Sequence, residues 1–133
     1  MNFMQNYAHA GGRILLSLIF IMDGMIKLQD PLGYASALGS IGIPGAGPYV
    51  HIAAYALIAA EILGGFMILV GYQTRNAAIA LACLYLSSAI LLNLSIGSRA
   101  EIMDFLQTLG IAGGFFILFA QGPGKLSLDS LAK

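Results

Sequence analysis

Four long runs of apolar residues make up most of the chain, and shorter stretches rich in polar residues, Gly or Pro separate them. The runs cover residues 8–28, 51–71, 76–96 and 100–121. A helix that crosses the hydrocarbon core of a bilayer needs about 20 mostly apolar residues. The pattern therefore predicts four membrane-spanning helices within a single domain, residues 1–133. No small-residue cleavage site follows the first run, so we expect a retained span and not a signal peptide.

The connections between the runs predict how the helices are arranged. The second, third and fourth runs are joined by only a few residues, which favours antiparallel neighbours. The first connection is much longer and rich in Gly and Pro. Asp30 can cap a helix that Pro31 opens, and we expect this short interfacial helix to extend through about Leu38. The predicted fold class is all-α, a transmembrane four-helix bundle with a short interfacial helix in the first loop.

Composition supports the membrane environment. The chain is 59% hydrophobic and only 9% charged, whereas soluble domains carry roughly 25% charged residues. A small soluble domain exposes much of its area and would need more polar surface than this. The formal net charge is zero, so no basic region predicts a nucleic-acid partner. The lipid bilayer is the expected surrounding.

The positive residues predict the orientation of the chain in that bilayer. Two sets of helix ends alternate along the sequence, and the set with more Lys and Arg is expected in the cytoplasm. The richer set holds Arg13, Arg75, Lys125 and Lys133, and the other holds Lys27 and Arg99. We therefore expect a multi-pass protein of a bacterial or archaeal inner membrane, with both termini cytoplasmic.

Small residues recur at helical spacing in two of the runs. Ala56, Ala60 and Gly64 are four residues apart, and Gly110 and Gly114 form a GxxxG pattern. Such spacing lets helix backbones approach closely in lipid. Chance is the alternative explanation, because alanine and glycine are abundant in this chain.

Three of the charged residues within the apolar runs are the main candidates for function. Asp23 and Lys27 lie four residues apart and can neutralise each other on one helix face. Lys27 could instead extend its ammonium group to the lipid headgroups. Glu61 lies ten residues into the second run, near the bilayer midplane, where an unpaired charge costs several kcal/mol. It must be protonated or pair across helices with Lys27 or Arg13. Its role is either functional or a polar contact that holds the fold.

Further polar residues fall at a similar depth. Asn93, Asp104 and Gln107 lie in the outer half of their predicted helices, as Asp23 and Lys27 do. If these residues face inward they converge on one cavity with Glu61 beneath it, and Tyr34 in the loop above is a candidate lid. Asn93 and Gln107 could alternatively serve as hydrogen-bonding contacts between helices.

Several chemistries are excluded by residue type. In the predicted topology His9 and His51 lie at opposite faces of the membrane, so they cannot ligate one metal or haem together. Cys83 is the single cysteine, which excludes an intrachain disulfide and any zinc or iron–sulfur set. We expect no metal site and no covalently bound cofactor. Any redox role would use a diffusible molecule such as a quinone, or a centre on a partner.

Several motifs, in their order and spacing, resemble the DoxX family of small four-helix membrane proteins. They are GRILLSLIFIMDGMIKLQDP, GIP, AAEILGGFMILVGYQTR and FLQTLGIAGGFFILFAQGPGKLSLD, which together cover nearly the whole chain. The family pattern falls on Gly24, Lys27, Leu28, Glu61, Gly64, Gly65, Thr74 and Arg75. Many members carry a histidine late in the third helix. Asn93 stands in that region here, and asparagine does not titrate.

The resemblance implies a redox role in the membrane, because related proteins are linked to thiosulfate:quinone oxidoreductase and to membrane redox complexes. The leading hypothesis is an integral membrane subunit of a quinone-linked oxidoreductase. In it Glu61 exchanges a proton, Lys27 holds an anionic or carbonyl oxygen, and Asp23 completes the site. One alternative is a non-catalytic membrane anchor or assembly partner of a redox enzyme, and another is a small-molecule or proton carrier. The expected protein partners are a redox-enzyme subunit or a second copy of the chain.

Overall fold

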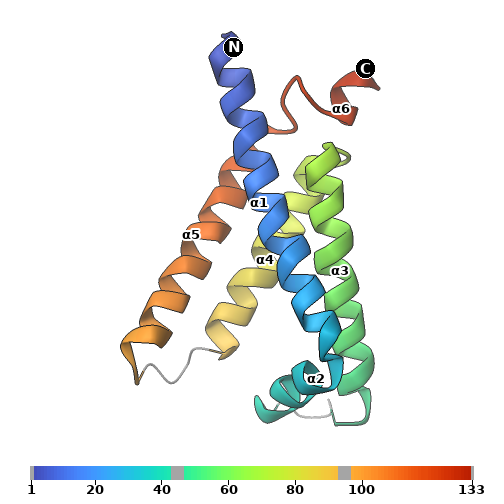
Figure 1. Ribbon diagram of the computed structural model, residues 1–133, viewed down its shortest axis with the longest axis vertical. Helices are drawn as coiled ribbons and strands as arrows, with labels where there is room; N and C mark the ends of the chain where they lie inside the picture. The colour runs from blue at the N-terminus through green and yellow to red at the C-terminus, as the bar shows by residue number, and fades with distance from the viewer. Residues whose placement is uncertain (1, 43–46, 93–96, 133) are drawn as a thin grey trace.

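The computed structural model describes residues 2–42, 47–92 and 97–132, and every element in these ranges is helical (Figure 1). In chain order the elements are α1 (Phe3–Gln29), α2 (Pro31–Ser40), the 3-10 helix η1 (Gly47–Tyr49), α3 (Val50–Val70), α4 (Thr74–Leu92), α5 (Arg99–Gln121) and α6 (Leu128–Leu131). The predicted all-α class is confirmed. The long helices α1, α3, α4 and α5 correspond to the apolar runs of the sequence.

Three helical segments among the described residues are long and apolar enough to cross a membrane. They are Gly47–Val70, Thr74–Leu91 and Arg99–Gln121. Helix α1 has 27 residues, which is also long enough, but it carries Arg13, Asp23 and Lys27 within its length. The end of the third predicted run, residues 93–96, lies outside the described residues.

Polar side chains fix where two of the helices begin. Helix α2 starts as the sequence predicts, with Pro31 in its first turn and the Asp30 carboxylate accepting a hydrogen bond from the Gly33 amide at 2.9 Å. Helix α4 is capped from a distance. Asp129, near the C-terminus, accepts hydrogen bonds from the amides of Gln73 at 2.8 Å and Thr74 at 3.0 Å. The C-terminal segment is thereby attached to the start of α4.

The long helices pack mainly as two pairs, α1 against α3 and α4 against α5, and α3 also contacts α4 (Figure 1). Side chains from four helices meet in the core, which includes Phe20, Ile68, Leu81 and Phe115. The Phe20 ring meets Phe115 edge-on, with 4.9 Å between the ring centroids. The two termini lie at one end of the molecule, and α2 lies at the other.

Glycines allow α1 and α3 to approach closely. A Cβ atom added to Gly65 would lie 2.9 Å from Ile21 Cγ1 and 3.3 Å from the Ile21 backbone nitrogen. A Cβ on Gly24 would lie 2.6 Å from Ile62 Cγ1. Gly64 faces α4, where a Cβ would meet the Leu81 side chain at 3.0 Å. The close contact between these helices therefore depends on residues without side chains.

The other small residues singled out from the sequence divide between contact and open space. A Cβ on Gly114 would meet Leu16 of α1 at 3.2 Å, but nothing lies within 4 Å of the same position on Gly110. Ala56 and Ala60 are exposed, and α3 buries Ala54, Ile58 and Glu61 instead. Of the predicted small-residue stripe on α3, Gly64 therefore packs against another helix and the two alanines do not.

Candidate functional site

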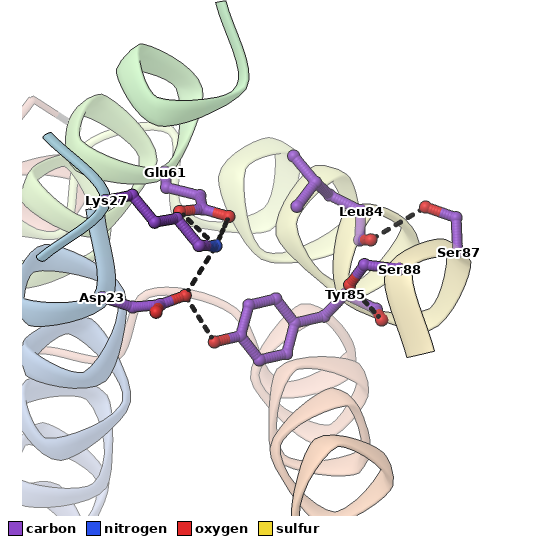
Figure 2. Close-up of polar contacts among 7 residues, drawn as sticks. All are labelled: Asp23, Lys27, Glu61, Leu84, Tyr85, Ser87 and Ser88. Atoms are coloured by element: carbon purple, nitrogen blue, oxygen red, sulfur yellow. Dashed lines mark hydrogen bonds and ion pairs between the residues drawn. The ribbon is translucent and has the colours of Figure 1, made fainter. Parts of the chain in front are cut away.

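Three charged side chains from α1 and α3 meet in one cluster (Figure 2). The Lys27 ammonium group lies 2.7 Å and 3.0 Å from the two carboxylate oxygens of Glu61. It also lies 2.8 Å from Asp23 Oδ2, one turn earlier on α1. Of the two cations that the sequence offers to Glu61, the structure pairs it with Lys27. We call Asp23, Lys27 and Glu61 the ionic cluster.

The ionic cluster runs from the core toward the surface. The Glu61 side chain is 1% exposed, that of Lys27 is 21% exposed and that of Asp23 is 32% exposed. Two carboxylates share one ammonium group, so the binding of a single proton would make the cluster electrically neutral. A buried set of charges that a proton can neutralise is suited to taking up and releasing that proton.

Two tyrosines complete the surroundings of the cluster. The Tyr85 hydroxyl of α4 donates a hydrogen bond to Asp23 Oδ2 at 3.0 Å (Figure 2). The ring of Tyr34 on α2 lies beneath the Lys27 ammonium group, with 4.9 Å between Nζ and the ring centroid. Burial raises the pKa of Tyr34 above the ordinary value of 10.0, so its hydroxyl is neutral at physiological pH. The site therefore draws on α1, α2, α3 and α4.

Tyr85 is the residue that the sequence interpretation missed. It sits in an otherwise apolar stretch of α4, and its ring packs on Phe20 with 4.4 Å between the centroids. A tyrosine in such a stretch is most simply explained as a core or interface aromatic. The available signal was depth, because its position on α4 is level with Asp23 on the neighbouring helix.

Two adjoining cavities border the cluster. The smaller, about 190 Å³, is lined by Asp23, Lys27, Tyr34, Tyr85, Ser88, Ala89 and Thr108. The larger, about 530 Å³, lies between α1, α4 and α5, and it shares Asp23, Tyr85 and Thr108 with the first. Its remaining lining is apolar from Ile19, Met22, Ile26 and Ile111, and polar from Asp104 and Gln107. We call the two together the cluster groove.

The predicted site residues take different places around this groove. Asp23 and Lys27 line it directly, whereas Glu61 lines neither cavity and lies behind Lys27. Asp104 and Gln107 are exposed on α5 and line the larger cavity beside Asp23. Tyr34 lines the smaller one. Asn93, the remaining candidate from the sequence, falls outside the described residues.

Family-pattern residues at the other end of the molecule have structural partners. The Thr74 hydroxyl lies 3.3 Å from Asp129 Oδ2, and Arg75 Nη2 lies 3.5 Å from the Ala120 carbonyl oxygen. Both contacts tie the start of α4 to the C-terminal part of the chain. Leu28, next to Lys27, is 52% exposed and takes no part in the cluster. In the described part of the chain no three His, Cys, Asp or Glu side chains are grouped as metal ligands.

The apolar helices and the ionic cluster buried between them define an all-helical membrane protein. This chain belongs to the DoxX family, whose model matches residues 8–94. It is 32% identical over 119 residues to inner membrane protein YqjF of Escherichia coli, covering 90% of this chain and 87% of that protein. It is 28% identical over 124 residues to inner membrane protein YphA of the same organism, covering 88% and 84%.

A third relative carries a functional name. The Bacillus subtilis protein named "Putative oxidoreductase CatD" is 29% identical over 82 residues, which cover 62% of this chain and 57% of that protein. No solved structure matches the chain significantly. The comparisons thus establish the family and its membrane setting.

Proposed function

We propose that the chain is an integral inner-membrane subunit of a quinone-linked oxidoreductase system, and that the cluster groove is its quinone site. The observation that carries this proposal is the position of Lys27. Its ammonium group is held between buried Glu61 and half-buried Asp23, at the wall of the smaller cavity. The adjoining larger cavity adds an apolar surface from Ile19, Met22, Ile26 and Ile111. A fixed donor beside an apolar surface is suited to binding a lipophilic carbonyl compound.

The placement in the membrane follows from the helices. We take α1 as a fourth span in addition to the three apolar ones, because it packs against α3 and its Lys27 is paired there with Glu61. Helix α2 then lies at the interface. The two termini share one end of the molecule, and the larger number of Lys and Arg at that end supports a cytoplasmic location for both. A reporter enzyme fused to the C-terminus and active only outside the cytoplasm would contradict this orientation.

The volume and the lining of the groove are compatible with a quinone. The larger cavity, about 530 Å³, falls within the roughly 300–1,000 Å³ of small-molecule sites. Ile19, Met22 and Ile111 provide the apolar surface for a quinone ring and the start of its tail. Lys27, at the polar end, can donate a hydrogen bond to a quinone carbonyl oxygen. Tyr34, whose ring contacts Lys27, lines the same smaller cavity.

The cluster can also supply a proton. Reduction of a quinone to a quinol adds two electrons and two protons, one proton to each carbonyl oxygen. The two electrons would come from a partner dehydrogenase. Lys27 would give one proton to the nearer oxygen and regain it from protonated Asp23, which is reprotonated from water. The second proton would reach the other oxygen from water. Glu61 acts through Lys27 in this scheme and is a positioning residue. The name of the Bacillus subtilis relative supports a redox setting.

The test is the binding of decylubiquinone to the full chain in nanodiscs, measured for Glu61→Gln. Glutamine keeps the shape and still accepts a hydrogen bond from Lys27, but the charge that anchors the ammonium group is lost. We expect affinity to fall roughly tenfold, since hydrogen bonds to charged groups contribute about 1.5–3 kcal/mol. The matched control is Glu101→Gln at the start of α5, where glutamine preserves the capping box. Its affinity should equal the wild type.

A non-catalytic anchor is the second candidate function, and one observation favours it. The ionic cluster and Tyr85 connect α1, α3 and α4, so they hold the helices together whether or not a ligand binds. If this is their whole role, Glu61→Gln lowers the unfolding temperature while decylubiquinone binds the wild type and the variant equally, or binds neither. That result would leave the anchor as the better explanation.

A further inference from the structure

A second hollow lies at the opposite end of the molecule, where the two termini meet. It measures about 450 Å³ and lies between α1 and α5. Its polar lining comes from Gln5, His9, Arg13 and Gln121, and its apolar lining includes Leu16 and Ile117. We call it the terminal groove. It shares no lining residue with the cluster groove.

Arg13 is the charged residue of this groove, and it is 5% exposed. Its Nη1 atom donates a hydrogen bond to the Pro123 carbonyl at 2.6 Å, and Nη2 donates to the Leu126 carbonyl at 2.5 Å. These neutral acceptors hold the guanidinium group in place without cancelling its charge. The Nε atom is also buried, and it has no hydrogen-bond partner among the described residues.

His9 provides a second buried nitrogen in the same groove, since its Nε2 atom also has no hydrogen-bond partner within the described part of the chain. Buried polar groups without partners are uncommon in folded proteins, because each one costs free energy. His9 and Arg13 lie four residues apart on α1, and therefore on one face of the helix. The two nitrogens are thus a pair of potential donors beside one hollow.

Arg13 is the one charged residue among those that line the groove, and none of them is acidic. Asp129, which lies outside this lining, attracts Arg13 electrostatically and also accepts hydrogen bonds from the amides of Gln73 and Thr74. A fixed guanidinium group next to a polar hollow is a recognition element for a phosphate oxygen.

We infer that the terminal groove binds the phosphate group of an anionic phospholipid. The phosphate accepts hydrogen bonds from Arg13 Nε and His9 Nε2, and Gln5 and Gln121 face the headgroup. The apolar part of the groove, with Leu16 and Ile117, takes the beginning of an acyl chain. This continuity of a polar end with an apolar wall favours a lipid over free phosphate. The inference does not depend on the quinone proposal, because the groove lies at the other end of the bundle.

Adjacent glycines on α1 offer a matched pair of test variants. A Cβ added to Gly11 or to Gly12 has no atom within 4 Å, so a side chain can begin at either position without a clash at its first carbon. Gly12 lines the terminal groove, whereas Gly11 does not. Gly12→Leu is therefore designed to obstruct the groove, and Gly11→Leu adds the same side chain at a position that does not line it.

The experiment reconstitutes the full chain in nanodiscs of equal parts phosphatidylglycerol and phosphatidylcholine and identifies retained lipid by native mass spectrometry. We expect wild type and Gly11→Leu to retain phosphatidylglycerol over phosphatidylcholine by roughly fivefold, the effect of about one basic residue on an anionic lipid. Gly12→Leu should show no preference. In lipid-free detergent, inorganic phosphate should not raise the melting temperature of the wild type.

Two outcomes would overturn the inference. Equal retention of the two lipids by the wild type would remove the anionic-lipid site, and this result does not require any variant to fold. A preference in Gly12→Leu equal to that in Gly11→Leu would move the site away from the terminal groove. Stabilisation of the wild type by inorganic phosphate alone would show a free-phosphate site and overturn the assignment to a lipid.

Discussion

At the scale of single residues, Lys27 is the connection on which the candidate site depends. It binds Glu61 on α3, Asp23 on its own helix and the ring of Tyr34 on α2. Each carboxylate is tolerable near the core because this one ammonium group lies between them. Removal of either carboxylate leaves an ion pair, whereas removal of the cation leaves two acids facing each other.

Lys27→Met should therefore be the most damaging single change in the cluster. We expect a loss of about 3–5 kcal/mol in the free energy of unfolding, the range for breaking a buried ion pair. The double variant Lys27→Met/Glu61→Leu should recover part of that loss, because it removes the more buried acid as well. Unfolding in detergent by a denaturant titration measures both.

The control for that experiment is Lys125→Met, which removes an exposed lysine near the C-terminus. Its effect should stay within about 0.5 kcal/mol. A loss in Lys27→Met no larger than that in the control would show that the cluster is solvated and contributes little to stability.

At the scale of helices, residue type and spacing predict much of the structure but not which face of α3 packs. The pairing of Lys27 with Glu61 follows from an unpaired acid at mid-span and a cation one helix away. The capping of α2 by Asp30 follows from its neighbour Pro31. Which face of α3 packs cannot be predicted in this way, because alanines and glycines lie on several sides of the helix. The glycine at position 65 packs on α1, and the alanines at 56 and 60 do not.

The contacts that the C-terminal segment makes could not be predicted from the sequence, for a different reason. Arg13 binds backbone carbonyls of Pro123 and Leu126, and every residue carries such a carbonyl. No residue type marks the acceptor, so the sequence cannot select it. The cap that Asp129 provides for α4 could not be predicted either. Asp129 is 55 residues from Thr74, whereas the capping signals that a sequence shows act within one helical turn.

The glycine face of α3 gives a prediction at the scale of helix packing. Gly65→Ala places a methyl group against the backbone of Ile21 and should lower the free energy of unfolding by about 1–3 kcal/mol, as overpacking does. Gly110→Ala, in open space on α5, should change it by no more than about 0.5 kcal/mol. Equal effects of the two substitutions in a detergent unfolding titration would contradict the α1–α3 contact.

At the scale of the whole molecule, polar chemistry is concentrated at two separated places in an otherwise apolar bundle. The ionic cluster lies toward the end that carries α2, and Arg13 lies at the end where the termini meet. Between them the core is formed by aromatic and aliphatic side chains such as Phe20, Phe115 and Ile68. The two polar places are thus separated by the core, and under the proposed function only the cluster groove, between α1, α4 and α5, takes the quinone.

The central claim, that the cluster groove is a quinone site, is tested most directly by photolabelling. The full chain in nanodiscs would be irradiated with a diazirine analogue of decylubiquinone, and the labelled residues mapped by mass spectrometry. The account predicts labels on Met22, Ile26 and Ile111, which line the groove, and their loss with excess unlabelled decylubiquinone. Labels on exposed residues that do not line the groove, such as Leu63 and Phe66, unaffected by the competitor, would contradict it.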